Sequence, residues 1–220
     1  MRKIFITILL LLLAATSNAA ISAAEGITAD VDRESDEINI LLVICFPYGA
    51  NINLMRDVME LYGWNVTTTA LTPLTGPCYY GGPMTVDIPL TDITDLSPYD
   101  CVAIMQSKAW SGTSHAQLLS SPEALALVAQ AVSENLLVAA HCGGTRVLAA
   151  ADVINGVRVT GHGLYEDEYI AAGGIYVGNP SPPVLDGNIL TVVRGQYYSY
   201  QFCDAVAAAI DSMRAASTNN

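Results

Sequence analysis

A cysteine and two glycines stand where an apolar run meets a small-residue helical pattern, in residues 136–151, L-L-V-A-A-H-C-G-G-T-R-V-L-A-A-A. A strand that turns at once into a helix is typical of a nucleophile elbow, which lifts one side chain out of the sheet. Gly143 and Gly144 let the backbone crowd closely there. The N–H groups at a helix start favour thiolate over thiol, so Cys142 is the first candidate nucleophile. The alternative is that Cys142 is buried and packs as a small hydrophobe.

Three histidines, His115, His141 and His162, are available to move a proton for this cysteine. His141 directly precedes Cys142, but neighbouring strand residues face opposite sides, so His141 is either a proton shuttle or a hydrogen-bonded structural histidine beneath the elbow. His162 follows a predicted strand and precedes three acidic residues, 166–168. This order allows a Cys-His-acid arrangement with Cys142. The alternative is a loop histidine ahead of an ordinary acidic helix start.

Strand and helix patterns alternate along the rest of the chain. The near-continuous apolar run at 38–45 predicts a parallel strand covered on both faces. The remaining elements are predicted as a helix at 51–62 ended by Gly63, a strand at 66–70, a loop at 71–96 with a small hairpin near 79–88, a strand at 101–105, a helix from Pro122 to 134 capped by Ser121, strands at 136–140, 157–160 and 189–193, and a helix at 198–214. Such alternation predicts a parallel sheet between helices, with ligands bound at the carboxyl ends of its strands. The elbow lies at that edge.

The N-terminal segment reads as an export signal followed by one domain. Two basic residues precede an apolar stretch at 4–15, and small-residue cleavage sites follow Ala19 and Ala24. We expect a signal peptide at 1–24, an acidic mobile leader at 25–37, a single domain at 38–214 and a tail at 215–220. The mature protein is then secreted or extracytoplasmic. An uncleaved membrane anchor is the alternative, but the apolar stretch is shorter than the roughly 20 residues that span a bilayer.

The net charge and the cysteine spacing limit the kinds of ligand and partner that the protein is expected to bind. The formal net charge of −12 argues against binding to nucleic acid or, after signal cleavage, to a membrane. Five cysteines are an odd number, so at least one is unpaired in an oxidising compartment; if that one is Cys142, the other four allow three pairings. Their spacing has no C-x-x-C and no paired histidines, so we expect no metal site, and nothing indicates a cofactor.

Five short sequence segments follow one another in a recognisable order: Y-G-W-N-V at 62–66, Y-D at 99–100, A-H-C-G-G at 140–144, N-G-V-R-V-T at 155–160 and V-L-D-G-N-I-L-T at 184–191. In this order the chain resembles the ThiJ/PfpI family, a group of class I glutamine-amidotransferase-like proteins that includes peptidases and deglycase-type enzymes. The resemblance implies an α/β three-layer sandwich with a mostly parallel, flavodoxin-like central sheet. It also implies cysteine chemistry and a homo-oligomer.

Three positions depart from the pattern of that family. Gly143 stands where many members have a histidine, Asn51 where they have a glutamate, and Gln106-Ser107 where they have Gly-Gly. Asn51 can hydrogen-bond a thiolate but cannot share its proton. The backbone N–H groups of Gly143 and Ser107 remain candidates for an oxyanion hole.

Two functions from different classes fit these residues. The first is an exported cysteine-dependent hydrolase, an amidase, peptidase or deglycase-like enzyme, that acts on a small molecule or peptide through Cys142, with His141 or His162 moving the proton. The second is a catalytically silent module of the same fold that binds a ligand or senses oxidation.

Overall fold

A seven-stranded central sheet organises the computed structural model, which describes residues 37–45, 52–72, 85–107, 115–179, 183–193 and 199–218. The strand order is β3-β2-β1-β4-β5-β9-β8, with parallel pairing except between β8 and β9. The strands are β1 (Asn39–Val43), β2 (Asn65–Ala70), β3 (Ile88–Pro89), β4 (Cys101–Ile104), β5 (Leu137–His141), β8 (Val184–Asp186) and β9 (Ile189–Val192). The predicted signal peptide and the candidate residue Asn51 lie outside the described residues.

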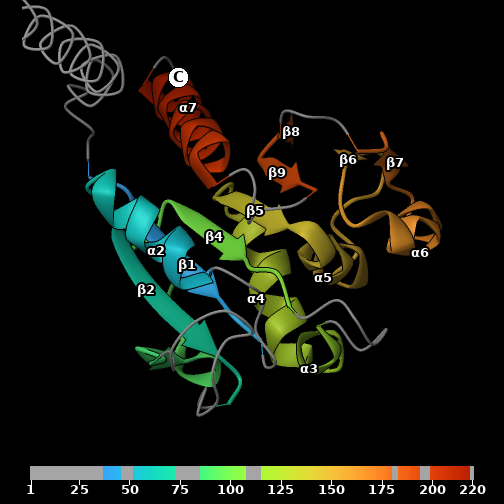
Figure 1. The fold of residues 1–220 in the computed structure, drawn as a ribbon, viewed down its shortest axis with the longest axis horizontal. Coiled ribbons are helices and arrows are strands. Elements are labelled where there is room, and N and C mark those ends of the chain that lie inside the picture. The colour runs from blue at the N-terminus through green and yellow to red at the C-terminus, as the bar shows by residue number, and fades with distance from the viewer. Residues whose placement is uncertain are drawn as a thin grey trace, which may run out of the picture. The chain divides into compact units, whose positions relative to one another are not determined.

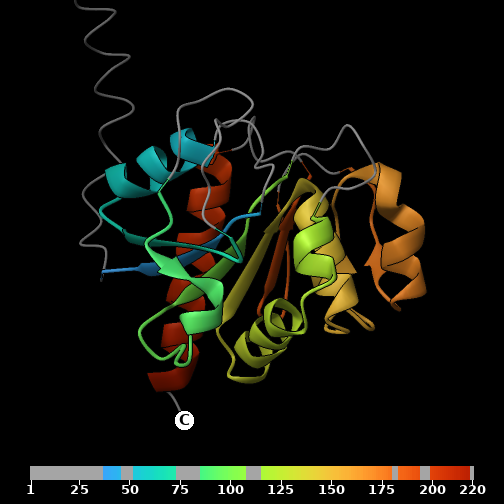
Figure 2. The ribbon, with the colours of Figure 1, turned by 90° about the horizontal axis from the view of Figure 1, so that it is seen from below.

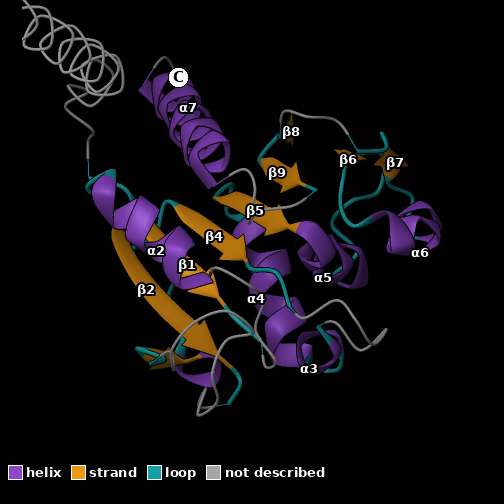
Figure 3. Cartoon of the chain, in the orientation of Figure 1, coloured by secondary structure: helices purple, strands orange, loops and turns teal. Residues whose placement is uncertain are grey.

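Helices cover both faces of this sheet (Figure 1, Figure 2). On one face lie α2 (Ile52–Leu61) and α7 (Ser199–Thr218), and on the other lie α3 (Ala116–Leu119), α4 (Pro122–Ser133) and α5 (Thr145–Ala150). The central strands are apolar on both sides because each side packs against a helical layer, as in β1, where alternate residues enter the two cores. The predicted α/β three-layer sandwich with a mostly parallel sheet is confirmed (Figure 3).

The helix boundaries follow local signals in the sequence. The predicted cap Ser121 accepts a hydrogen bond from the Ala124 backbone N–H at 3.2 Å and so starts α4. Gly63 follows α2 with a φ of 77°, a conformation that stops a helix and that glycine adopts readily. None of the described helices combines the length and the apolar character needed to cross a membrane.

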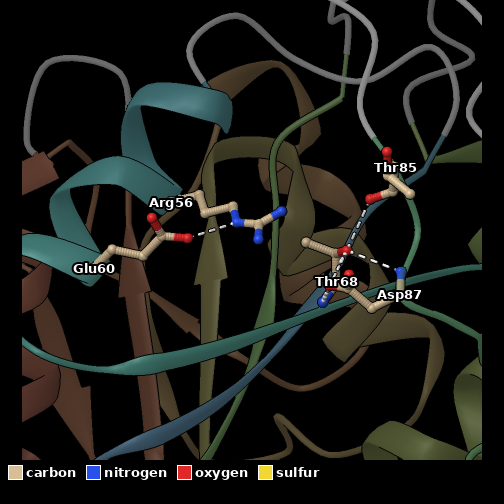
Figure 4. A network of polar contacts seen from close by, with 5 residues as sticks. All are labelled: Arg56, Glu60, Thr68, Thr85 and Asp87. Carbon is tan, nitrogen blue, oxygen red and sulfur yellow. Dashed lines mark hydrogen bonds and ion pairs between the residues drawn. The ribbon is translucent and has the colours of Figure 1, made fainter.

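Most of the segment predicted to hold a small hairpin, near 79–88, lies outside the described residues, and its described end leads into a parallel edge strand. β3 pairs with the end of β2, and η1 (Leu90–Asp92) follows it. The approach to β3 is fixed by Asp87, whose carboxylate accepts hydrogen bonds from the Thr68 hydroxyl at 2.6 Å and backbone N–H at 2.8 Å; the same hydroxyl lies 2.9 Å from the Thr85 carbonyl (Figure 4). These bonds hold the described residues before β3 against β2, where the parallel pairing of the two strands begins.

A second, two-stranded sheet lies in the chain between α5 and β8. It pairs β6 (Arg158–Val159) with β7 (Ile175–Tyr176), and between them run η4 (Gly163–Tyr165) and α6 (Glu166–Ala171). The predicted strand at 157–160 is therefore real but short, and it does not pair within the central sheet. This segment carries His162 back toward the carboxyl edge of β5.

Candidate active site around Cys142

The predicted turn after β5 is present and is sharp. β5 ends at His141, a 3₁₀ turn covers Cys142–Gly144, and α5 begins at Thr145. Cys142 has a φ of 55°, in the left-handed region that non-glycine residues rarely adopt. Backbone strain of this kind at the carboxyl edge of a parallel sheet is a feature of functional positions. Cys142 retains 9% of its surface exposure.

Gly144 lets the turn sit against the neighbouring strand. A Cβ atom at this position would lie 2.7 Å from the Ile104 carbonyl oxygen at the end of β4. Real Cβ atoms do not approach a backbone oxygen so closely, so only glycine fits without a shift of the backbone. Gly143, the candidate oxyanion donor, is buried in the same turn and follows Cys142 directly.

His141 lies on the opposite face of β5 from the α5 layer. Its ring packs edge-on against Phe202 of α7, with ring centroids 4.1 Å apart. The side chain is fully buried, and neither ring nitrogen has a hydrogen-bond partner within the described part of the chain. Burial lowers the pKa of His141 to about 3, so the ring is neutral at physiological pH. The structure thus places His141 beneath the elbow but without the hydrogen bond expected of a structural histidine.

His162, in contrast, lies beside the elbow. Its backbone N–H donates to the Cys142 carbonyl oxygen at 3.1 Å, and its side chain is half-buried. The ring nitrogen Nδ1 accepts a hydrogen bond from the Leu164 backbone N–H at 3.2 Å. With Nδ1 acting as acceptor, the neutral ring carries its proton on Nε2 and presents an N–H donor.

Tyr169 is a neighbour of the cysteine that the sequence did not single out. Its hydroxyl donates to the His162 carbonyl oxygen at 3.4 Å, and a Cβ at Gly161 would lie 2.7 Å from that hydroxyl and 3.0 Å from the Cys142 carbonyl oxygen. Burial raises the pKa of Tyr169 above its usual range, and the nearby Cys142 adds to the rise. Tyr169 therefore stays protonated at the side of the elbow. A single tyrosine on a short acidic helix carries no sequence signal that marks it.

Of the three acidic residues expected to orient His162, Glu168 has a different partner. Glu168 binds Arg146 of α5 with both carboxylate oxygens, at 2.7 and 2.9 Å. Glu166 and Asp167 are exposed in the first turn of α6. Glu168 is therefore not the acid of a Cys-His-acid arrangement in this structure, because it binds Arg146. The two N–H groups of the arginine match a carboxylate better than one imidazole N–H does.

Ser107 lies at the end of β4 in a buried polar cluster with Cys45 and His115. Burial raises the pKa of the Cys45 thiol to about 11, opposed by hydrogen bonds from the Ser107 side chain and the His115 backbone. The His115 ring nitrogen Nε2 lies 2.8 Å from the Met105 carbonyl oxygen. Burial lowers the pKa of His115 to about 4. Because the Ser107 side chain is hydrogen-bonded to Cys45, the group of Ser107 that could act at Cys142 is its backbone N–H.

The four described cysteines, Cys45, Cys101, Cys142 and Cys203, are buried, and none of them forms a disulfide; Cys78 lies outside the described ranges. Burial raises the pKa of Cys203 to about 12 and that of Cys101 higher still. Within the same ranges, no group of three or more His, Cys, Asp or Glu side chains is arranged to hold a metal ion.

A model of the DJ-1/PfpI family matches residues 41–209, which include Cys142 and both histidines beside it, His141 and His162. The chain belongs to the DJ-1/PfpI family. Solved structures with the same fold include a ThiJ/PfpI domain protein from Brachyspira murdochii, with a TM-score of 0.68, 19% identity and coverage of 80% of this chain and 98% of that one. DJ-1beta from Drosophila melanogaster gives a TM-score of 0.63, 20% identity and coverage of 80% and 95%.

A third relative shows the same domain fused to another. It is a two-domain protein from Anabaena variabilis with DJ-1/ThiJ/PfpI-like and ferritin-like domains, with a TM-score of 0.66 and 21% identity, and the match covers 80% of this chain but 48% of that one. At these identities the likeness shows the shared fold. The chemistry of this DJ-1/PfpI protein has to be argued from its own side chains.

The glycine in the turn can be tested by stability. Gly144→Ala places a Cβ against the Ile104 carbonyl and should lower the free energy of unfolding by about 1–3 kcal/mol, the usual cost of overpacking. Urea unfolding measures this. Gly163→Ala is the matched control, because its nearest contact would be an ordinary 3.4 Å to the Tyr176 hydroxyl oxygen. Equal stability losses in the two variants would contradict the close approach of the elbow to β4.

His141 predicts an acid-dependent loss of stability. A buried histidine whose pKa is about 3 in the folded state and about 6.5 when unfolded leaves stability intact above pH 6.5, and stability falls as the pH drops toward 3. His141→Leu removes this term. The variant should match the wild type within about 1 kcal/mol at pH 7.5 and gain on it by up to about 1.4 kcal/mol per pH unit below 6.5. Urea unfolding from pH 7.5 to 4.5 checks this, and parallel curves for the two proteins would rule it out.

Proposed function

We propose that the protein is an exported, cysteine-dependent hydrolase of the DJ-1/PfpI family, acting on an amide, peptide or related acyl substrate with Cys142 as the nucleophile. The observation that carries the proposal is the left-handed turn at Cys142, which ends β5 and starts the α5 segment at the carboxyl edge of the sheet. A turn of this kind costs free energy, and positions that retain such strain cluster at active sites.

The reaction requires a thiolate and a way to hold negative charge. The Cys142 sulfur attacks the acyl carbon, the bond to the amine breaks, and the amine leaves with a proton from water. Hydroxide from that water then cleaves the thioester, which releases the acid and restores the thiolate. The sum is hydrolysis of one amide bond by one water molecule.

His162 suits the role of a donor to the thiolate. The Leu164 N–H occupies Nδ1, so the neutral ring has to give up that bond before Nδ1 can accept a proton. The Nε2–H is a donor and can stabilise a nearby thiolate. The geometry therefore supports His162 as a charge-stabilising partner of Cys142 over His141, whose ring faces Phe202.

The oxyanion that forms during attack would be stabilised by backbone N–H groups at the start of the helix. The first N–H groups of a helix have no partner within it, and the Gly143 amide is the first after the nucleophile. The Ser107 backbone at the end of β4 is the second candidate donor. Asn51 remains a candidate from the sequence.

The alternative is a catalytically silent module that binds a ligand or senses oxidation. The small exposed fraction of Cys142 is what favours it, since a substrate needs access to the sulfur. The two functions separate on whether Cys142 turns over a substrate.

Alkylation rates test both the reactivity of Cys142 and which histidine acts on it. Limiting iodoacetamide at neutral pH should label Cys142 before Cys45, Cys101 and Cys203, whose thiol pKa values are raised by burial. Peptide mass spectrometry measures this. His162→Phe should slow the labelling of Cys142 by roughly tenfold or more, whereas His141→Phe should leave it within about twofold.

Turnover completes this test. Cys142→Ser should abolish any hydrolysis of ester, amide or glycated-amine substrates that the purified protein shows. If Cys142 labels no faster than Cys101 in the native protein, the hydrolase proposal fails and the silent module stands.

Export is tested by the mature N-terminus. Because the apolar segment at 4–15 is short and precedes small residues, we expect protein recovered from outside the cytoplasm to begin near Ala20 or Glu25. Intact mass measures the cut. A membrane-bound form that retains Met1 would show an anchor instead.

A further inference from the structure

Arg146 and Glu168 join the elbow helix to the segment that carries His162. Arg146 lies in α5, four residues after Cys142, and its Nε and Nη2 atoms contact the two Glu168 oxygens at 2.7 and 2.9 Å. The Arg146 side chain is 11% exposed, and that of Glu168 is 44% exposed. The two helices lie side by side in both ribbon views (Figure 1, Figure 2).

Arg146 also contacts the residue that supports His162. Its guanidinium carbon lies 4.2 Å from the centre of the buried Tyr165 ring, within the range of a cation–π interaction. The Tyr165 ring centre is in turn 5.6 Å from that of His162. A single arginine therefore holds residues 162–169 at two points, through Tyr165 and through Glu168.

The same segment is bonded to the elbow itself. The His162 N–H donates to the Cys142 carbonyl, and the Tyr169 hydroxyl donates to the His162 carbonyl. These backbone contacts fix the position of the His162 main chain. The His162 ring itself is bordered by the Leu164 N–H, which donates to Nδ1, and by the Tyr165 ring, which Arg146 covers.

We infer that the Arg146–Glu168 pair is a latch that holds residues 162–169 on the elbow, so that Arg146 and Glu168 are positioning residues for His162. The inference rests on the proposed role of Cys142 as nucleophile. A bidentate fork fixes the relative rotation of the two helices, which a lysine at the same position does not. A partly exposed ion pair adds little to global stability, so its effect lies in orientation.

A latch and a purely electrostatic role give opposite signs for one variant. Removal of the Glu168 carboxylate takes one negative charge away from Arg146, which lies four residues after Cys142, and by charge alone this favours the thiolate and speeds alkylation. Loss of the latch lets the His162 ring move away and slows alkylation. Arg146→Lys separates the two further, because it keeps the positive charge but loses the fork.

The experiment compares Glu168→Ala and Arg146→Lys with the wild-type protein. The first readout is the rate of Cys142 alkylation against pH, and the second is amide hydrogen exchange of residues 162–169. Glu60→Ala is the matched control, since it breaks the 2.8 Å Arg56–Glu60 ion pair of α2 (Figure 4). This helix packs on the other face of the sheet from α5.

We expect both variants to slow alkylation at neutral pH by about tenfold and to speed exchange in residues 162–169 by at least about tenfold, with neither change in Glu60→Ala. Faster alkylation in Glu168→Ala with no change in Arg146→Lys overturns the latch, and so does unchanged exchange in either variant.

Failure of the proposed function shows itself separately. If wild-type Cys142 reacts no faster than an ordinary thiol, the nucleophile proposal is wrong. The exchange readout then decides the latch alone: faster exchange in both variants supports it, and unchanged exchange overturns it.

Discussion

The left-handed turn at Cys142 is the constraint on which the rest of the site depends. The residue directly after β5, with a φ of 55°, redirects the chain within one step, and the following Gly144 lets that chain pass against the end of β4. The sulfur is thereby set at the carboxyl edge of the sheet, where loops from several strands meet. The features around it follow from the need to hold this turn: Gly144 against Ile104, Gly161 against Tyr169, and His162 bonded to the Cys142 carbonyl.

The turn also separates two histidines that are both close to the cysteine in space or sequence. Strand alternation places the residue before the turn on the α7 side, where the His141 ring is buried against Phe202. His162 arrives from a distant segment on the α5 side, where the cysteine emerges. Because His141 directly precedes Cys142, its side chain faces the other side of the sheet, which argues against it as the partner of Cys142. The hydrogen bond from the His162 N–H to the Cys142 carbonyl argues for His162 instead.

Much of the fold was predictable because its signals are local. The apolar run of β1, the Ser121 cap of α4 and the glycine-rich turn after β5 each predict their element from a few residues. The pairing of β6 with β7 was not predictable, because a two-residue strand has no periodicity of its own. The pairing of Arg146 with Glu168 was missed for a related reason: it joins residues 22 apart, and no local pattern shows which acid an arginine will bind. Tyr169 was missed because a single tyrosine on a short acidic helix carries no signal that it lies beside Cys142. The catalytic roles assigned to Cys142, His162 and Gly143 remain predictions.

The turn is expected to make Cys142 a reactive thiolate. The most direct test is to measure the ultraviolet thiolate absorbance of the wild-type protein and of Cys142→Ser across pH and to take the difference. A thiolate held at the start of α5 beside an N–H donor should titrate at least about one pH unit below the ordinary thiol value of about 8.5. A difference signal that titrates at or above that value would contradict the claim and leave Cys142 as a buried, unreactive thiol.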